Sequence, residues 1–172
     1  MPDYKLEQLS PRSFEHLIQA LVLKYLGPHL TVFGDGPDGG REATFAGSVN
    51  YPDSTSGWKG DGVIQVKFRQ VPETRESDAS WLIERVQKDL GNRRRVGDLL
   101  YRLDGGGYPV DAPQFYLLVS NVTLSSVAAT GGKDRVIARL REHQKRLGWT
   151  AFDLWDGDKI GRLLDDSVEI TS

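Results

Sequence analysis

The sequence predicts an α/β fold with a mixed central sheet of about five strands, flanked by helices. The 172-residue chain alternates short apolar segments typical of strands with longer segments whose apolar residues recur at helical spacing. Helices separate most of the strands, an order that indicates a partly parallel sheet covered by helices on its faces. The length fits one domain with its own core, so we expect residues 1–172 to form a single domain.

The composition is that of an ordinary globular protein, with 38% apolar and 27% charged residues. The formal net charge of −2 argues against binding nucleic acid by bulk charge, but it leaves room for a local basic surface. Cysteine is absent and the three histidines lack metal-ligand spacing, which excludes thiolate chemistry and disfavours zinc. No apolar stretch has transmembrane length and no signal peptide opens the sequence, so we expect a cytoplasmic protein without membrane contact.

The first half of the chain is expected to form one helix and three strands, at residues 10–26, 30–33, 42–49 and 62–69. Ser10 is a favourable N-cap for the helix, Pro11 suits its first turn and Gly27 suits its end. A glycine-rich loop separates the first two strands, and the turn-forming residues 50–60 precede the third.

The second half is expected to begin with a helix at residues 78–92 and a second helical piece at 95–103. A strand at 114–121, a helix at 132–147, a strand at 149–155 and a terminal helix at 157–165 are expected to follow. Ser77 is the expected cap of the first of these helices, and residues 104–109 are expected to form a flexible connector. The arginine run at 93–95 is interpreted as a solvated helix face or end, with a basic surface beside a site as the alternative. The sequence ends abruptly over residues 165–172, with no closing element there, which suggests the N-terminal part of a larger protein.

The strand at 62–69 is the most informative segment for function. Strand alternation divides its side chains between two faces: Ile64, Val66 and Phe68 on one, and Gln65, Lys67 and Arg69 on the other. A glutamine and a lysine two residues apart are awkward in an apolar core. They suit a site that also holds a carboxylate, a hydrated metal ion and a phosphate.

The oxygen donors near this strand match Mg²⁺, which takes one or two protein carboxylates and keeps several waters. Glu42 can supply a carboxylate and Gln65 an amide oxygen, and the peptide carbonyl of Val66 is a third candidate ligand. Asp38 is the better candidate of the two loop aspartates because it is closer to Glu42. Lys67 can orient the attacking water or neutralise charge on the phosphate.

Each of these residues also has an ordinary structural interpretation. Glu15 lies at the edge of the apolar stripe of the first helix and can reach the sheet, but alone it is a first-turn acid favoured by the helix dipole. Asp38 alone is a turn former, and Lys67 alone can extend its amine to solvent. Their joint occurrence in this order favours a catalytic site. The basic residues expected to contact DNA are Arg41, Lys59 and Arg69.

The pattern resembles the Mrr-like branch of the PD-(D/E)xK restriction-endonuclease superfamily. Three segments carry the resemblance: Phe14-Glu15, Asp38-Gly39-Gly40-Arg41-Glu42 and Gln65-Val66-Lys67. It is closest to the Mrr-like nuclease domains at the N-terminus of large bacterial antiviral NTPases of the STAND and NACHT type, and clearest over residues 10–70. The resemblance implies a restriction-endonuclease-like three-layer sandwich.

The resemblance also implies an endonuclease that uses Mg²⁺, with Mn²⁺ as a substitute, to cut DNA in antiviral defence. Glu42 would then be the metal-binding acid, Gln65 the second metal-site residue and Lys67 the catalytic lysine. Glu15 would be a supporting acid. Gln65 stands where the wider superfamily has an acid, and Glu42 where Asp is more usual, so metal affinity is expected to depend on Asp38 or on the bound phosphate. Control by homo-oligomerisation, or by a fused or associated NTPase sensor, is implied as well.

Two other functions fit the same residues. The neutral Gln65 and the unusual Glu42 leave room for a nuclease-like module without catalysis, which would serve as an adaptor or a DNA-binding platform. A repair or Holliday-junction nuclease with the same core is the third possibility, and a panel of branched, single-stranded and linear DNA substrates distinguishes it.

Overall fold

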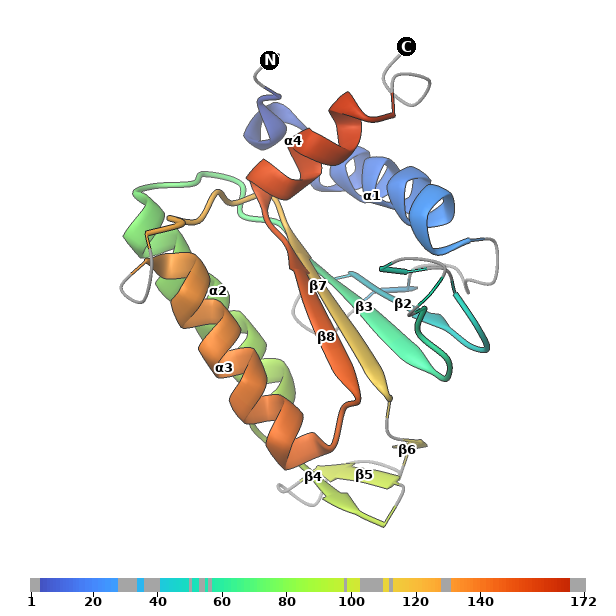
Figure 1. Ribbon diagram of the computed structural model, residues 1–172. Coiled ribbons are helices and arrows are strands. Elements are labelled where there is room, and N and C mark those ends of the chain that lie inside the picture. The colour runs from blue at the N-terminus through green and yellow to red at the C-terminus, as the bar shows by residue number, and fades with distance from the viewer. Residues whose placement is uncertain are drawn as a thin grey trace.

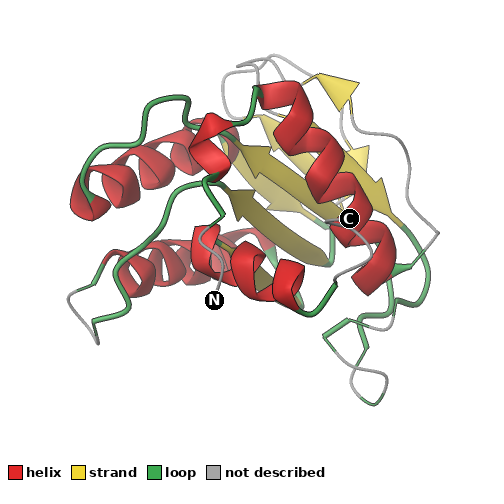
Figure 2. Cartoon of the chain, turned by 90° about the horizontal axis from the view of Figure 1, so that it is seen from above, coloured by secondary structure: helices red, strands yellow, loops and turns green. Residues whose placement is uncertain are grey.

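The computed structural model is an α/β protein in which a five-stranded sheet lies between two layers of helices (Figure 1). The view from above shows helices on both sides of the strands (Figure 2). The structure describes residues 4–27, 34–35, 41–49, 51–52, 55, 57–97, 99–102, 110–111, 113–127 and 131–167, with the backbone alone at 34–35, 41–42, 102 and 110–111.

The central sheet is mixed. Its strands, in their order across the sheet, are β1 (Gly34–Asp35), β2 (Arg41–Phe45), β3 (Gly62–Lys67), β7 (Phe115–Ser120) and β8 (Ala151–Trp155). β1, β2 and β3 pair antiparallel, whereas β3, β7 and β8 pair parallel. Helices connect the parallel strands, as such connections require. The predicted α/β class with a mixed sheet is confirmed.

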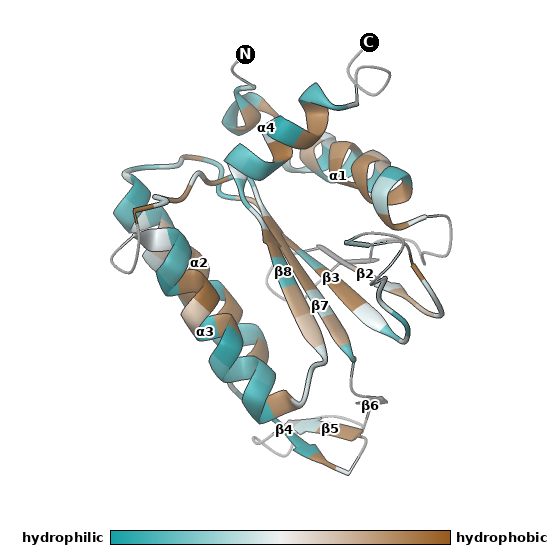
Figure 3. Cartoon of the chain, viewed as in Figure 1, coloured by the Kyte–Doolittle hydropathy of each residue, from teal (hydrophilic) through white to brown (hydrophobic). Residues whose placement is uncertain are grey.

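One face of the sheet is covered by α1 (Pro11–Leu26) and α4 (Gly157–Asp165), and a short 3₁₀ helix, η1 (Leu6–Gln8), precedes α1. α1 begins as predicted, because the Ser10 hydroxyl accepts the N–H of Ser13 and Pro11 is the first helical residue. Its apolar stripe lies in one core cluster with Ile64 and Val66 of β3. Figure 3 shows how the apolar parts of α1 and α4 lie beside these strands.

The opposite face is covered by α2 (Arg75–Leu90) and α3 (Gly132–Leu147), whose buried residues form a second core cluster. Tyr116 and Leu118 of β7 belong to this cluster, while Leu117 and Val119 belong to the first. All six residues of β7 are therefore buried, which explains why this strand is almost entirely apolar.

The N-terminus of α2 differs from the prediction. Thr74 caps the helix: its hydroxyl accepts the N–H of Ser77 at 3.1 Å, so α2 begins at Arg75 and Ser77 lies in its first turn. The prediction of Ser77 as the cap was wrong because both hydroxyl residues suit the position, and the chain direction before the helix decides between them.

The helical piece predicted at 95–103 was also wrong. The segment forms a hairpin of β4 (Arg93–Val96) and β5 (Leu99–Arg102), extended by β6 (Val110–Asp111). Gly97, at the turn, has φ of 62°, which favours glycine. The arginine run therefore lies in a strand, and Arg95 donates to the carbonyl oxygens of Leu147 and Gly148 at the end of α3. This tertiary contact outweighs the helical propensity of the local sequence.

The other predicted elements agree to within a few residues. α3 and α4 have the expected bounds, and Gly148 ends α3 in the left-handed conformation. β2 is shorter than predicted and ends at Phe45, and β8 begins at Ala151. The predicted strand at 30–33 and connector at 104–109 lie outside the described residues. Within the described part of the chain, no helix combines the length and apolar character needed to cross a membrane.

Candidate functional site

Two neighbouring strands bring the predicted metal-site positions together. In the antiparallel pairing of β2 and β3, Glu42 lies directly opposite Gln65, and Arg41 lies opposite Val66. Positions directly opposite in such a pair share one face of the sheet. The backbone register therefore sets Glu42 and Gln65 next to each other on the face that the prediction requires.

β3 divides its side chains as its alternation predicts. Ile64 and Val66 belong to the core under α1, whereas the amine of Lys67 reaches α2 on the opposite face. Gln65 and Lys67 are 7% and 3% exposed, so both polar side chains lie inside the protein. Buried polar groups at this depth require partners, because loss of hydration is costly.

One partner of Lys67 is Asp89, a residue that the sequence did not point to. Lys67 Nζ lies 2.7 Å from Asp89 Oδ2, and the Asp89 side chain is 16% exposed. Asp89 is in the last turn of α2, seven residues after the buried Leu82 and three after the buried Val86. A carboxylate at these spacings lies on the apolar stripe of the helix, and that was the available signal. The same signal selected Glu15.

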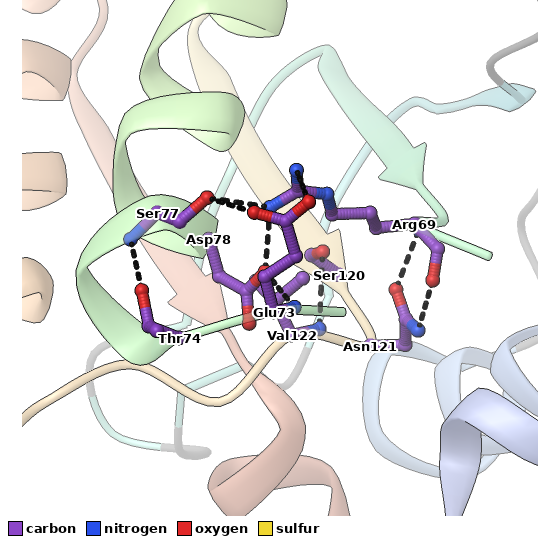
Figure 4. Close-up of polar contacts among 8 residues, drawn as sticks. All are labelled: Arg69, Glu73, Thr74, Ser77, Asp78, Ser120, Asn121 and Val122. Carbon is purple, nitrogen blue, oxygen red and sulfur yellow. Dashed lines mark hydrogen bonds and ion pairs between the residues drawn. The ribbon is translucent and has the colours of Figure 1, made fainter. Parts of the chain in front are cut away.

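The chain just beyond Lys67 is held in place by a network of polar contacts (Figure 4). Asn121, which follows β7, accepts the N–H of Arg69 at 2.8 Å and donates its amide to the Arg69 carbonyl oxygen at 2.9 Å. The Arg69 guanidinium donates to Asp78 Oδ1 at 2.7 Å and to Ser77 Oγ at 3.3 Å. These contacts fix the end of β3 against the first turn of α2.

Arg69 was predicted to contact DNA, and the structure gives it an internal role. Its guanidinium is 18% exposed, is paired with Asp78 and lies 5.6 Å from the ring centre of Trp81. A DNA phosphate would have to compete with Asp78 for this charge. The prediction of a DNA contact stays a prediction.

The remaining predicted residues lie in several places. Glu15 is 8% exposed and belongs to α1, in the helix layer on the other face of the sheet from Lys67. Lys59 is exposed and forms an isolated bridge with Ser48. Arg41 is placed by its backbone in β2, and Asp38 lies outside the described residues.

The candidate metal ligands that the structure describes are side-chain oxygen atoms, and the Lys67 amine lies beside one of them, on Asp89. Among the side chains that the structure describes, no three His, Asp or Glu residues gather to hold a metal ion. Asp89 is among those side chains, whereas Glu42 and Asp38 are not. The Gln65 amide and the Asp89 carboxylate are donors of the kind that Mg²⁺ prefers, and the Lys67 amine is suited to a phosphate oxygen.

The candidate site therefore consists of an amide and an amine on β3, a carboxylate on α2 and the backbone position of Glu42 on β2. Comparisons with protein-family models, with curated proteins and with solved structures each found no match to this chain.

Proposed function

We propose that this chain is a Mg²⁺-dependent endodeoxyribonuclease domain with a restriction-endonuclease-like fold, acting as an effector in prokaryotic antiviral defence. The observation that carries the proposal is the register of β2 and β3, which sets Glu42 opposite Gln65, with Lys67 two residues further along the same strand. The resemblance to Mrr-like nucleases supports the choice of DNA and the role in defence. A mixed sheet between two helix layers is compatible with the proposed fold.

Asp89 offers the negative charge that Gln65 lacks. Gln65 contributes an oxygen donor without charge, whereas Asp89 places a carboxylate at the amine of Lys67. Glu42 and Asp89, together with the Gln65 amide, would form the oxygen set that holds Mg²⁺. A Mg²⁺ ion bound there would polarise the scissile phosphate and lower the pKa of a water molecule.

Lys67 supplies positive charge for the transition state. Its amine is held beside Asp89 and is shielded from solvent, so its interaction with an entering phosphate oxygen would be weakly screened. Charge that develops on the phosphate is stabilised most by donors that are already in place. The clamp between Asn121 and Arg69 holds the strand end next to Lys67 and so helps to keep the amine in position.

The test is cleavage of supercoiled plasmid with Mg²⁺ or Mn²⁺, by the wild type and by Lys67→Met and Glu42→Gln. Each substitution should slow nicking by about 10²- to 10³-fold, the usual effect of losing one group that stabilises transition-state charge. Lys88→Met is the matched control, because Lys88 on α2 is 58% exposed and pairs with the exposed Glu84. It should cut at the wild-type rate.

The outcomes separate the proposal from its rivals once circular dichroism shows that the variants are folded. Wild-type rates in both Lys67→Met and Glu42→Gln would mean that the site is elsewhere. No cleavage by the wild type at any protein concentration, with DNA binding retained, would favour the non-catalytic DNA-binding module. That second candidate is favoured by one observation: Lys67 is 3% exposed and already paired with Asp89.

A further inference from the structure

A polar cavity lies at the edge of the sheet opposite β1. It has a volume of about 480 Å³ and is bordered by α3, the edge strand β8 and α4. Figure 1 shows β8 running between α3 and α4, with α4 beyond its C-terminal end. Four cationic side chains from two helices line the cavity: Lys133 and Arg141 of α3, and Lys159 and Arg162 of α4. We call this cavity, with its four cationic side chains, the β8-edge groove.

Within the described part of the chain, none of the four cations forms an ion pair or a side-chain hydrogen bond. One acid, Asp153, also lines the cavity, and its carboxylate accepts two neutral donors, the Tyr51 hydroxyl and the N–H of Leu154. Four cations and one carboxylate give the lining a net charge of +3. The excess of like charge around one hollow is repulsive, and an anionic ligand reduces that repulsion.

The charge of the groove stands out against the whole chain. α3 carries six basic and two acidic residues, a net charge of +4, in a protein whose net charge is −2. Hydrophilic residues, in teal, recur along α3 in Figure 3. Lys133, Ile137, Arg141 and Gln144 recur at spacings of four, four and three residues, so they form one stripe along the helix. This stripe lines the groove and contributes two of its four cations, Lys133 and Arg141.

An adjoining cavity of about 640 Å³ is lined by both acidic and basic side chains. It shares Lys133 and Arg162 with the groove, but Glu7, Asp158 and Asp165 line it as well. Acids and bases offset each other there. An extended anion would therefore lie along β8 and α3, over Arg141 and Lys159, and not in the adjoining cavity.

The backbone at this edge argues against an acidic peptide that adds a strand to β8. The N–H of Leu154 is taken by Asp153 Oδ1 at 2.7 Å, and the carbonyl oxygen of Thr150 accepts the Gln144 amide at 3.2 Å. Strand addition needs such groups free. A phosphate chain needs only the cations.

We propose that the β8-edge groove binds the phosphate backbone of a nucleic acid, at a site separate from the β2–β3 site. β7 alone separates β3 from β8, so these two strands lie two strand spacings apart, about 10 Å. A nucleic acid held at the groove would be kept close to the candidate catalytic residues. The choice of nucleic acid among polyanions rests on the proposed function, whereas the existence of an anion site rests on the four cations.

The test is fluorescence anisotropy with a labelled 20-base-pair DNA duplex in EDTA, so that cleavage cannot contribute. The variant Arg141→Gln/Lys159→Gln/Arg162→Gln should bind about 10- to 100-fold more weakly at 0.1 M salt. The slope of log K against log salt should become smaller by about 2 to 3, close to 0.9 for each lost phosphate contact. The matched control Arg12→Gln/Lys88→Gln/Arg139→Gln removes the same charge from exposed helix positions outside the groove and should keep most of the affinity.

The proposal would be overturned by equal affinity of the groove variant and the wild type, by an equal loss in the control variant, or by tighter binding of labelled polyglutamate than of DNA. Full displacement of the duplex by low-millimolar inorganic phosphate would also overturn it, in favour of a small-anion site. Plasmid cleavage tests the catalytic proposal separately. A wild type that binds through the groove but never cuts would refute the nuclease alone.

Discussion

Lys67 and Asp89 are the residues on which the candidate site depends most. They lie on different elements, and the pair is largely withdrawn from water. Removing one member of a buried pair leaves the other charge without compensation, which costs more than the pair itself contributes. The site is therefore a place where chemistry and stability use the same two groups.

We predict that Asp89→Asn lowers the free energy of unfolding by about 2 to 3 kcal/mol, because it breaks the buried ion pair with Lys67. Lys67→Met/Asp89→Leu should recover most of this loss, since both charges of the pair are then removed. The measurement is urea unfolding followed by circular dichroism. Glu84→Gln breaks the exposed pair with Lys88 on the same helix and should change stability by less than about 0.5 kcal/mol. Similar losses in Asp89→Asn and Glu84→Gln would contradict the buried pair.

At the scale of elements, α2 owes its position to its first turn. Thr74 caps the helix, and Asp78 in the first turn receives the Arg69 guanidinium and the N–H of Glu73. The Thr74 cap and the contact between Asp78 and Arg69 lie at the same end of the helix. A weakened start of α2 would therefore loosen the attachment of β3 as well.

Thr74→Ala is predicted to lower the free energy of unfolding by about 1 kcal/mol, the usual cost of losing an N-cap side chain. Ser77→Ala is the informative comparison, because the sequence analysis assigned the cap to Ser77. It should cost clearly less, since it removes only the weak 3.3 Å contact with Arg69 and a contact with the exposed Glu73. Chemical denaturation of both variants decides between the two caps, and a larger loss in Ser77→Ala would restore the original prediction.

The C-terminal turns of α3 hold the small sheet. Arg146 donates to the carbonyl oxygen of Leu90 at 2.7 Å, to that of Arg93, and lies 2.9 Å from Nδ1 of His143. Burial, and the positive charge of Arg146, lower the pKa of His143 to about 4. Glu142 opposes this shift, and Arg139 adds to it.

This pKa predicts a pH dependence of stability. Unfolded His143 takes up a proton near pH 6.5, whereas the folded side chain does so only near pH 4, so stability is complete above pH 6.5 and falls between these values. Compared with His143→Gln, the wild type should lose about 1 to 2 kcal/mol more between pH 7 and pH 4. Urea unfolding at a series of pH values measures this. The exposed His16→Gln is the control and should follow the wild-type profile, and an unchanged profile in His143→Gln would refute the assignment.

At the scale of the whole molecule, one buried polar cluster joins distant parts of the chain. The Tyr51 hydroxyl donates to the Asp153 carboxylate on β8 and accepts the indole N–H of Trp155 at 2.9 Å. Burial and the Asp153 charge raise the pKa of Tyr51, so the hydroxyl stays protonated. This cluster ties the segment before β3 to the edge strand.

Tyr51→Phe is predicted to lower the free energy of unfolding by about 1 to 3 kcal/mol, because it leaves a carboxylate and a buried indole N–H without their partner. Tyr4→Phe removes a single 3.0 Å bond to Asp165 at a part-buried position and should cost less. Thermal and urea unfolding of the two variants test the ranking. Equal losses would mean that the cluster around Tyr51 adds nothing beyond one ordinary hydrogen bond.

The sequence alone determined the features that depend on neighbouring residues. The stripe and caps of α1, the glycine end of α3, the apolar run of β7 and the alternation of β3 were all predicted, because each is written within one element. The choice of Gln65 and Lys67 as site residues came from that same alternation, and their burial on the α2 side agrees with it.

Only the tertiary structure decided what depends on groups far apart in the chain. The ion pair of Asp89 with Lys67 depends on the packing of α2 on β3, and so does the contact of Arg69 with Asp78. The arginine run became a strand because the end of α3 binds its backbone and side chains. A local pattern cannot encode these contacts, because the free energy that selects them comes from surfaces that meet only after the chain has folded.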